Sequence, residues 1–402
     1  TNFKLAWKFE ITTVAPTYSF YDIYIDATNN TFIKKLSKIH QDGPASLMYF
    51  GTQTIDTKPI GFNYYLKANN GTRNLHTKIS NGFVNDFGGW SNVTDGNDDW
   101  PYSDAHSTTA HWCATRAYDF FRYTYNQYGC DDNSGEIRIV ANRPEQGCAY
   151  TLAGNGNQIN KKDYITVGYT NNNYGSELDQ IGHEFTHGID KHNGDLEYIN
   201  ESGALDESFA DIFGVMVQKD NGNLNWTIGE LAGTLRVMDQ PSSSPAIGGG
   251  PQPSVYADIN NNWYVGAGDH GGVHTNSGVQ NYWFYLLSNG STGAPDGVVG
   301  NVIVNGIGVD KAANIAFYNL VNYIGNLSQY SDAAISSLLS ARDIYGLCSD
   351  ELKQTQNAWA AVGIGVPYAP LTISGPNTIY YLQNGSIFGS MPKTFVANGG
   401  VI

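Results

Sequence analysis

The sequence is poor in basic residues and has no long apolar run. Its 402 residues include 22 Lys and Arg against 37 Asp and Glu, a formal net charge of −15. Because no Lys/Arg cluster is present to follow a phosphate backbone, we expect no nucleic-acid partner. The longest apolar runs, 212–217 and 282–287, are far shorter than the roughly 20 residues that span a bilayer. We therefore expect no membrane segment and no membrane partner.

Cysteine is also scarce, since four cysteines in a chain of this length do not make a disulfide framework. Cys130 and Cys148 flank a turn-rich segment, and a bridge between them would close a short loop. We predict a disulfide at that pair. Cys113, in an expected helix, and Cys348, far away in sequence, can each equally be a small buried hydrophobic residue.

The composition favours an extracellular protein. The chain has 46 Gly, 27 Tyr, Asn-rich loops and little Lys, which suits a secreted protein. The opening residues TNFKLAWKF lack the charged start and apolar core of an export signal. We expect that such a signal has been removed or lies outside this sequence.

The order of the expected elements predicts an α+β fold with two lobes. Residues 5–102 contain short strand-like segments separated by Asn-Asn, Asn-Gly and Asp-Gly turns, which predicts mostly antiparallel β-structure. Residues 103–129 form one helical window, and the chain becomes mainly helical after residue 176. A β-rich half followed by a helical half is typical of an α+β plan. Residues 367–402, rich in strand formers, Pro and Gly, predict a linker or the start of a further β module.

An H-E-x-x-H pattern at residues 183–187 is the strongest chemical signal. At roughly 100° per helical residue, His183 and His187 project one turn apart, opposite an apolar stripe. Two imidazoles in this arrangement can share a zinc ion, and Glu184 can act as the general base toward a water molecule there. The stripe consists of Leu178, Ile181, Phe185 and Ile189.

The third metal ligand is predicted to be Glu207. It shares a helix face with Asp211, opposite the apolar residues of the same helix. It also lies within the apolar run 204–217, where an unpaired carboxylate is costly. Asp211 and Asp206 are predicted to support the ligands, because a carboxylate that accepts a hydrogen bond from a ligating His fixes its tautomer.

Three segments, HEFTH, NESGALDESFADIFG and GDHGGVHTNSG, together resemble the thermolysin family of zinc endopeptidases. The resemblance covers roughly residues 42–366, and Glu207 stands twenty positions after His187, as in that family. It implies one catalytic zinc ion on His183, His187 and Glu207, and activation of water by Glu184. It also implies the family's two-lobed fold, with the zinc helix between the lobes.

The resemblance implies roles for further residues of the cleft. Tyr198 and His274 would hydrogen-bond the oxyanion of the tetrahedral intermediate, where preorganised donors lower the barrier. Asp269 would orient His274. Arg236 would hold the substrate carbonyl beyond the scissile bond, and Ala149 would bind substrate backbone.

Three further positions bear on contacts with the substrate. Ile228 and Leu235 imply a preference for a bulky hydrophobic residue after the cleaved bond. Cys148 replaces the Asn of the family's substrate-binding Asn-Ala pair, so one side-chain contact to the substrate is in doubt.

The paired calcium site of the family is largely missing. Only two acids, Asp179 and Glu230, remain at the corresponding positions. Because calcium needs several oxygen ligands with enough negative charge, we expect at most one calcium ion.

The beginning of the chain is similar to the closing strands of the family's propeptide. The similar segments are LAWKFEI and YDIYIDATNNTFIKKLSKIH. The resemblance implies a pro-segment at residues 1–41, a β-rich lobe with the zinc helix at 42–198, and a helical lobe at 199–366. The mature enzyme would begin near 42–46. Its partners would be protein or peptide substrates and its own propeptide.

Other hydrolase patterns fit less well. A metzincin needs Gly and His where Asp190 and Asn193 stand, and no G-x-S-x-G segment for a nucleophilic serine occurs. The sequence therefore predicts a secreted zinc endopeptidase. The alternative is a non-catalytic binding or adhesion protein with a structural zinc, in which the fourth coordination position would be closed.

Overall fold

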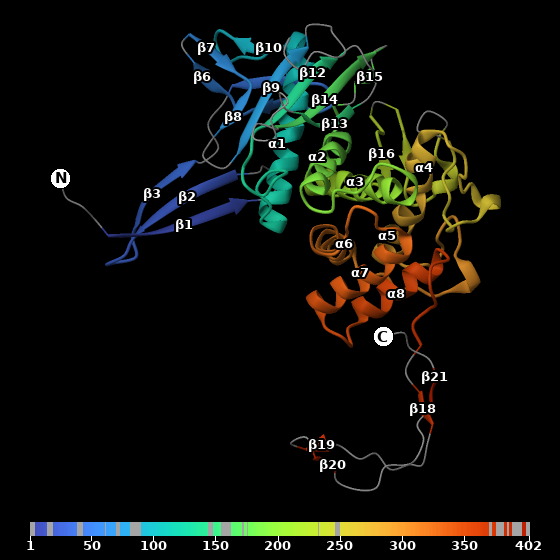
Figure 1. Cartoon of the computed structure of the whole chain (residues 1–402). Helices are drawn as coiled ribbons and strands as arrows, with labels where there is room; N and C mark the ends of the chain where they lie inside the picture. The colour runs from blue at the N-terminus through green and yellow to red at the C-terminus, as the bar shows by residue number, and fades with distance from the viewer. Residues whose placement is uncertain are drawn as a thin grey trace.

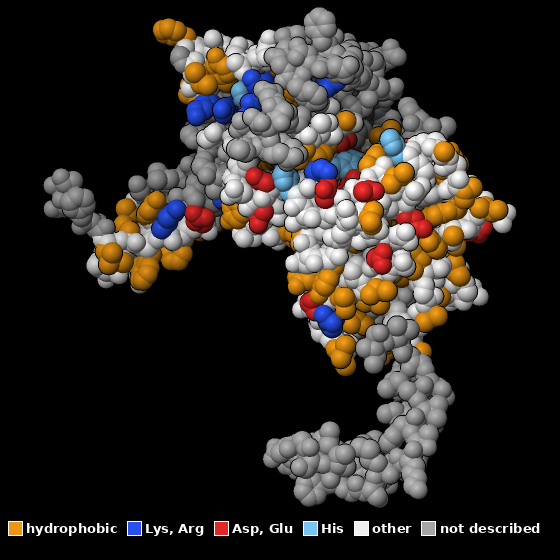
Figure 2. All heavy atoms as spheres, viewed as in Figure 1, with side chains coloured by type: hydrophobic (Ala, Val, Ile, Leu, Met, Phe, Trp, Pro, Cys, Tyr) orange, Lys and Arg blue, Asp and Glu red, His pale blue; other side chains and the backbone are white. Residues whose placement is uncertain are grey.

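The chain divides into a β-rich part and a helical part, which confirms the predicted α+β, two-lobed fold (Figure 1). Acidic and histidine side chains gather on the surface where the two parts meet (Figure 2). The computed structural model describes residues 5–13, 19–37, 43–60, 62–69, 73–80, 90–143, 148–153, 162–170, 173–174, 176–231, 233–245, 250–369, 372–374, 382–383, 386–387 and 396–398.

A seven-stranded sheet forms the centre of the β-rich part, with the strand order β10-β9-β12-β14-β13. Strand β8 pairs with β9, and β15 pairs with β14. The pairs β9–β12 and β12–β14 are parallel, while β13 runs antiparallel to β14 at one end of the order. The strands are β8 (Lys67–Asn69), β9 (Asn74–Ser80), β10 (Trp90–Asn92), β12 (Ile137–Arg143), β13 (Cys148–Ala153), β14 (Lys162–Thr170) and β15 (Asn173–Tyr174).

Antiparallel ladders link the named strands within residues 5–102, as the sequence predicts. The parallel pairs arise because α1 (Ala105–Tyr125) lies between β9 and β12 in the chain, and a parallel connection needs such a crossover. Helix α1 stops four residues before Gly129, since Asn126 adopts a left-handed conformation with φ 59°. The smaller sheets contain β1 (Ala6–Thr13), β2 (Ser19–Asp26), β3 (Phe32–Ser37), β4 (Pro44–Leu47), β5 (Gly51–Thr54), β6 (Lys58–Ile60), β7 (Asn63–Tyr65) and β11 (Thr94–Asp95).

Strands β1, β2 and β3 form a separate antiparallel sheet in order. In Figure 1 this sheet extends to one side of the molecule, near α1 and away from the helices of residues 278–361. Most of the 367–402 prediction falls outside the described residues. The described part there consists of the antiparallel pairs β18 (Thr372–Ser374) with β21 (Val396–Asn398) and β19 (Leu382–Gln383) with β20 (Ser386–Ile387).

The helical part is built around α3 (Asn200–Asp220), which is buried from Ser202 to Gln218. It packs against α2 (Leu178–His192) on one side and against later helices on others. No helix in the described ranges is long and apolar enough to cross a membrane. The remaining helices are α4 (Asp269–Asn276), α5 (Gly278–Asn289), α6 (Val309–Asn322), α7 (Tyr330–Tyr345) and α8 (Asp350–Ala361).

The apolar stripe of α2 turns toward α1 and fixes which way its histidines face. Phe185 is fully buried and stacks on Phe121 of α1, with ring centroids 5.4 Å apart. Ile181 and Ile189 are fully buried as well. Because this side of α2 packs in the core, the opposite side carries the polar groups that the sequence places there.

Two glycines allow α2 and α3 to pack closely. A Cβ atom at Gly214 would lie 2.5 Å from the carbonyl oxygen of Asp179, and one at Gly182 would lie 3.0 Å from the Val217 side chain. The absence of side chains at these positions lets the two backbones approach. This close approach brings the polar face of α2 to the polar face of α3.

The predicted disulfide between Cys130 and Cys148 is wrong. No disulfide joins the four cysteines, all of which are described. Cys130 packs against α2, with Sγ 3.8 Å from the carbonyl oxygen of Phe185, whereas Cys148 begins β13. Burial raises the pKa of both thiols and favours the neutral form.

Gly214→Ala tests the helix spacing. We expect a loss of about 1–3 kcal/mol in the free energy of unfolding, because the added methyl group meets backbone. Gly325→Ala is the control, since its Cβ atom would enter open space, and we expect a change within about 0.5 kcal/mol. Denaturant unfolding measures both. Equal midpoints for Gly214→Ala and the wild-type chain would contradict the spacing argument.

Candidate active site

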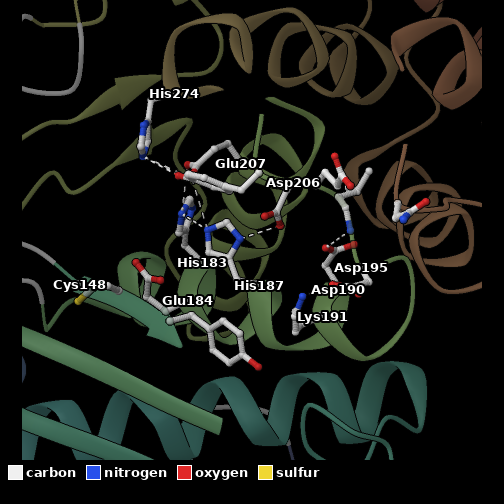
Figure 3. Close-up of a pocket in the computed structure, with 16 residues that line it drawn as sticks. Cys148, His183, Glu184, His187, Asp190, Lys191, Asp195, Asp206, Glu207 and His274 are labelled. Carbon is white, nitrogen blue, oxygen red and sulfur yellow. Dashed lines mark hydrogen bonds and ion pairs between the residues drawn. The ribbon is translucent and has the colours of Figure 1, made fainter. Parts of the chain in front are cut away.

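Helices α2 and α3 bring His183, His187 and Glu207 to one point. The two Nε2 atoms lie 3.0 Å apart. Glu207 reaches both rings, with Oε2 3.5 Å from His183 Nε2 and Oε1 3.6 Å from His187 Nε2. The structure therefore places the three predicted ligands together, on faces that the helical period assigns to them (Figure 3).

The chemistry of these three groups fits a zinc ion. One ligand atom from each residue lies within 4.8 Å of the others. Oε2 of Glu207 is buried and has no hydrogen-bond partner among the described residues. Two imidazole nitrogens and one carboxylate oxygen are a common zinc set, and a cation here would satisfy the buried oxygen.

Two aspartates accept hydrogen bonds from the imidazole rings and hold the rings in place. Asp211 Oδ1 lies 2.9 Å from Nδ1 of His183, and Asp206 Oδ1 lies 2.7 Å from Nδ1 of His187. Each ring therefore turns Nε2 toward the centre. Such contacts fix the ring orientation and raise the basicity of a metal-binding nitrogen.

The charges around Glu207 keep it ionised although it is buried. Burial alone would raise its pKa, but the neighbouring imidazoles of His274, His183 and His187 and the guanidinium of Arg236 hold the pKa at about 2. The site thus presents a carboxylate, the form that a metal ion requires.

Glu184 lies beside the metal-binding residues and lines the same cavity of about 740 Å³. Figure 3 shows its carboxylate beside His183, on the side toward Cys148. Its side chain is largely buried, and burial raises its pKa. A carboxylate with a raised pKa in this position is suited to accept a proton.

Tyr198 and His274 approach the centre from the opposite side. The Tyr198 hydroxyl donates to Glu207 and lies 3.2 Å from Nε2 of His274. Nδ1 of His274 lies 2.6 Å from Asp269 Oδ1. Asp269 and the next residue, His270, have left-handed φ angles of 51° and 49°. Consecutive non-glycine residues in this region store strain, which is typical of functional loops.

The guanidinium group of Arg236 forms two hydrogen bonds with the carboxylate of Asp211. Its Nε lies 2.7 Å from Asp211 Oδ2, and its Nη2 lies 2.6 Å from Oδ1. Asn281 Nδ2 also donates to Oδ2 of this aspartate, at 2.8 Å. Arg236 thus fixes the carboxylate that orients His183, and its predicted contact to a substrate carbonyl stays a prediction.

The predicted substrate-binding residues lie in different surroundings. Ala149 is exposed on β13 and lines the cavity together with Cys148. Ile228, in β16 (Thr227–Ile228), is buried, and Leu235 is half-buried, but neither lines this cavity. β16 pairs with β17 (Arg236–Val237), which places Ile228 opposite Arg236.

A second group of acids lies at the start of α2. Asp179 and Glu230 come together as predicted, and the structure adds Glu177, which the sequence interpretation missed. In the sequence, the position of Glu177 two residues before Asp179 was the signal that could have identified it as a member of this group. Oε2 of Glu230 and Oε1 of Gln218 are buried without hydrogen-bond partners among the described atoms. Burial, with the charges of Glu177 and Glu230, raises the pKa of Asp179.

Comparisons with known proteins agree with this geometry. The pattern of the thermolysin metallopeptidase catalytic domain matches residues 43–191, and that of the thermolysin metallopeptidase alpha-helical domain matches residues 194–364. A bacillolysin from Brevibacillus brevis is 31% identical over 364 residues, covering 90% of this chain and 64% of that protein. A thermolysin from Bacillus sp. (strain EA1) is 31% identical over 387 residues, covering 90% of this chain and 67% of that protein.

A solved structure shares the fold. The precursor of protealysin, a metalloproteinase from Serratia proteamaculans, superposes with a TM-score of 0.56 at 23% identity. The match covers 72% of this chain and 87% of that one. With both domain patterns matched and the ligand residues brought together, the chain belongs to the thermolysin family of metallopeptidases.

Proposed function

We propose that this chain is a secreted, zinc-dependent endopeptidase. The observation that carries the proposal is the convergence of two imidazole nitrogens and a buried carboxylate oxygen in a cavity that also exposes Glu184. His183, His187 and Glu207 would hold the metal. When bound, zinc supplies Lewis-acid chemistry, polarising a carbonyl and lowering the pKa of water.

Glu184 would be the general base. Its carboxylate takes a proton from the attacking water molecule, and the resulting carboxylic acid gives that proton to the leaving amine. The cavity position of Glu184 next to His183 supports this role.

Tyr198 and His274 would stabilise the negative charge that develops on the carbonyl oxygen. The Tyr198 hydroxyl and Nε2 of His274 both lie at the cavity, 3.2 Å apart, so two donors can reach one oxyanion. Asp269 Oδ1 lies 2.6 Å from Nδ1 of His274 and fixes the ring with Nε2 toward the Tyr198 hydroxyl.

The substrate would lie along β13. This strand ends the sheet order, so its outer edge can pair with an extended peptide beside Ala149. Arg236 would contact the substrate carbonyl after the cleaved bond, and Ile228 and Leu235 would favour a bulky hydrophobic residue there. Cys148 would supply no side-chain amide to the substrate.

Three further assignments complete the proposal. Residues 1–41 would be a pro-segment, which is supported by the separate sheet of β1–β3. The chain would act outside the cell. Glu177, Asp179 and Glu230 would bind a single calcium ion, with Gln218 Oε1 as a further oxygen.

Glu184→Gln tests the general base. We expect kcat to fall by about 10²-fold or more, because the amide cannot accept the proton. Zinc content should stay at the wild-type level, since Glu184 is no ligand in this account. The control is Asp350→Asn, an exposed acid at the start of α8, with unchanged kcat. Full activity in Glu184→Gln would refute the role, and full zinc content with no activity even in the wild-type chain would favour the binding-protein alternative.

Asp211→Asn tests the support of His183. We expect zinc affinity to fall by about 10- to 100-fold, because the amide disturbs both the imidazole and Arg236. Competition with a chromophoric chelator measures the affinity directly. Asp310→Asn, a surface control on α6, should bind zinc as the wild-type chain does. Equal zinc affinity in Asp211→Asn and the wild-type chain would contradict the argument.

A further inference from the structure

The cavity extends past the metal-binding residues to a wall at the end of α2. This wall, here called the acidic end, consists of Asp190, Lys191, Asp195, Leu196 and Glu197. In Figure 3, Asp190, Lys191 and Asp195 lie together on the side of His187 away from Glu184. The acidic end is thus a separate part of the cavity from the reacting groups.

The charge of the acidic end is negative. Lys191 forms an ion pair with Asp195, which leaves the carboxylate of Glu197 as the uncompensated charge of this wall. Glu197 is exposed, and in the described ranges its carboxylate forms no hydrogen bond or ion pair. It is therefore available to a cation that enters the cavity.

Asp190 supplies an independent sign that a donor binds here. Its side chain is 3% exposed, and Oδ2 accepts from the Leu196 amide at 3.0 Å. Oδ1 has no hydrogen-bond partner among the described residues. Burial and the charge of Asp206 raise the pKa of Asp190 to about 8. A cationic group beside Asp190 would favour its ionised carboxylate, and the N–H of that group would supply the donor that Oδ1 lacks.

We infer that the acidic end is a subsite for a Lys or Arg side chain of the peptide substrate. Glu197 would pair with the cationic group, Asp190 would accept from its N–H, and Leu196 would contact the aliphatic stem. The inference rests on the proposed endopeptidase function. Because Ile228 and Leu235, assigned to the residue after the cut, do not line this cavity, the subsite takes a residue before the cut.

Peptide cleavage by the full chain with zinc tests the subsite. Fluorogenic peptides would carry Arg, norleucine or Glu at each of the two positions before the cleaved bond, with Leu after it. For one position we expect kcat/KM to be roughly fivefold higher with Arg than with norleucine. Glu197→Gln should reduce that ratio to near one while leaving the norleucine peptide unchanged. Asp350→Asn should keep the wild-type ratio.

Glu197→Lys provides a second variant with an opposite expectation. It should favour the Glu peptide over the Arg peptide, because the charge at position 197, which would pair with the substrate side chain, is reversed. A wild-type chain that cleaves Arg and norleucine peptides equally, or a Glu197→Gln chain with an unchanged ratio, would overturn the subsite and leave the endopeptidase proposal standing. Failure to cleave any of the peptides would instead count against the endopeptidase proposal.

Discussion

The structure depends on a carboxylate buried against two imidazoles at the contact of α2 and α3. Glu207 is 1% exposed, and its charge is costly there unless cationic groups or a metal ion surround it. The close packing at Gly182 and Gly214 brings the carboxylate to the rings. The packing of α2 and α3 thus buries a negative charge that a cation at this site would stabilise.

A layer of hydrogen bonds surrounds this contact and explains why so many charges lie in one place. Asp211 links His183 of one helix to Arg236 of a β-hairpin, and Asn281 of α5 holds the same carboxylate. Asp269, in the strained start of α4, likewise holds Nδ1 of His274. His183 and His274 face the cavity, and each is held by an aspartate that does not line it, which preorganises these rings for one geometry.

The sequence predicts the metal ligands well because helical period and burial pattern place His183, His187 and Glu207 on inward faces. It predicts Glu177 and Asp190 poorly, since each becomes significant only through contacts distant in sequence or through an unsatisfied oxygen. The disulfide prediction failed for the same reason: the chain positions of Cys130 and Cys148 do not report that Cys130 packs against the Phe185 carbonyl of α2. Parallel pairing of β9 with β12 likewise depends on the path of α1.

The most direct test of the account is X-ray anomalous scattering at the zinc edge on crystals of the full chain, together with Glu207→Ala. The account predicts one strong peak bounded by Nε2 of His183, Nε2 of His187 and a Glu207 carboxylate oxygen, with a solvent position facing Glu184, and loss of that peak in the variant. A peak bound elsewhere, or one retained in full without the Glu207 carboxylate, would contradict it.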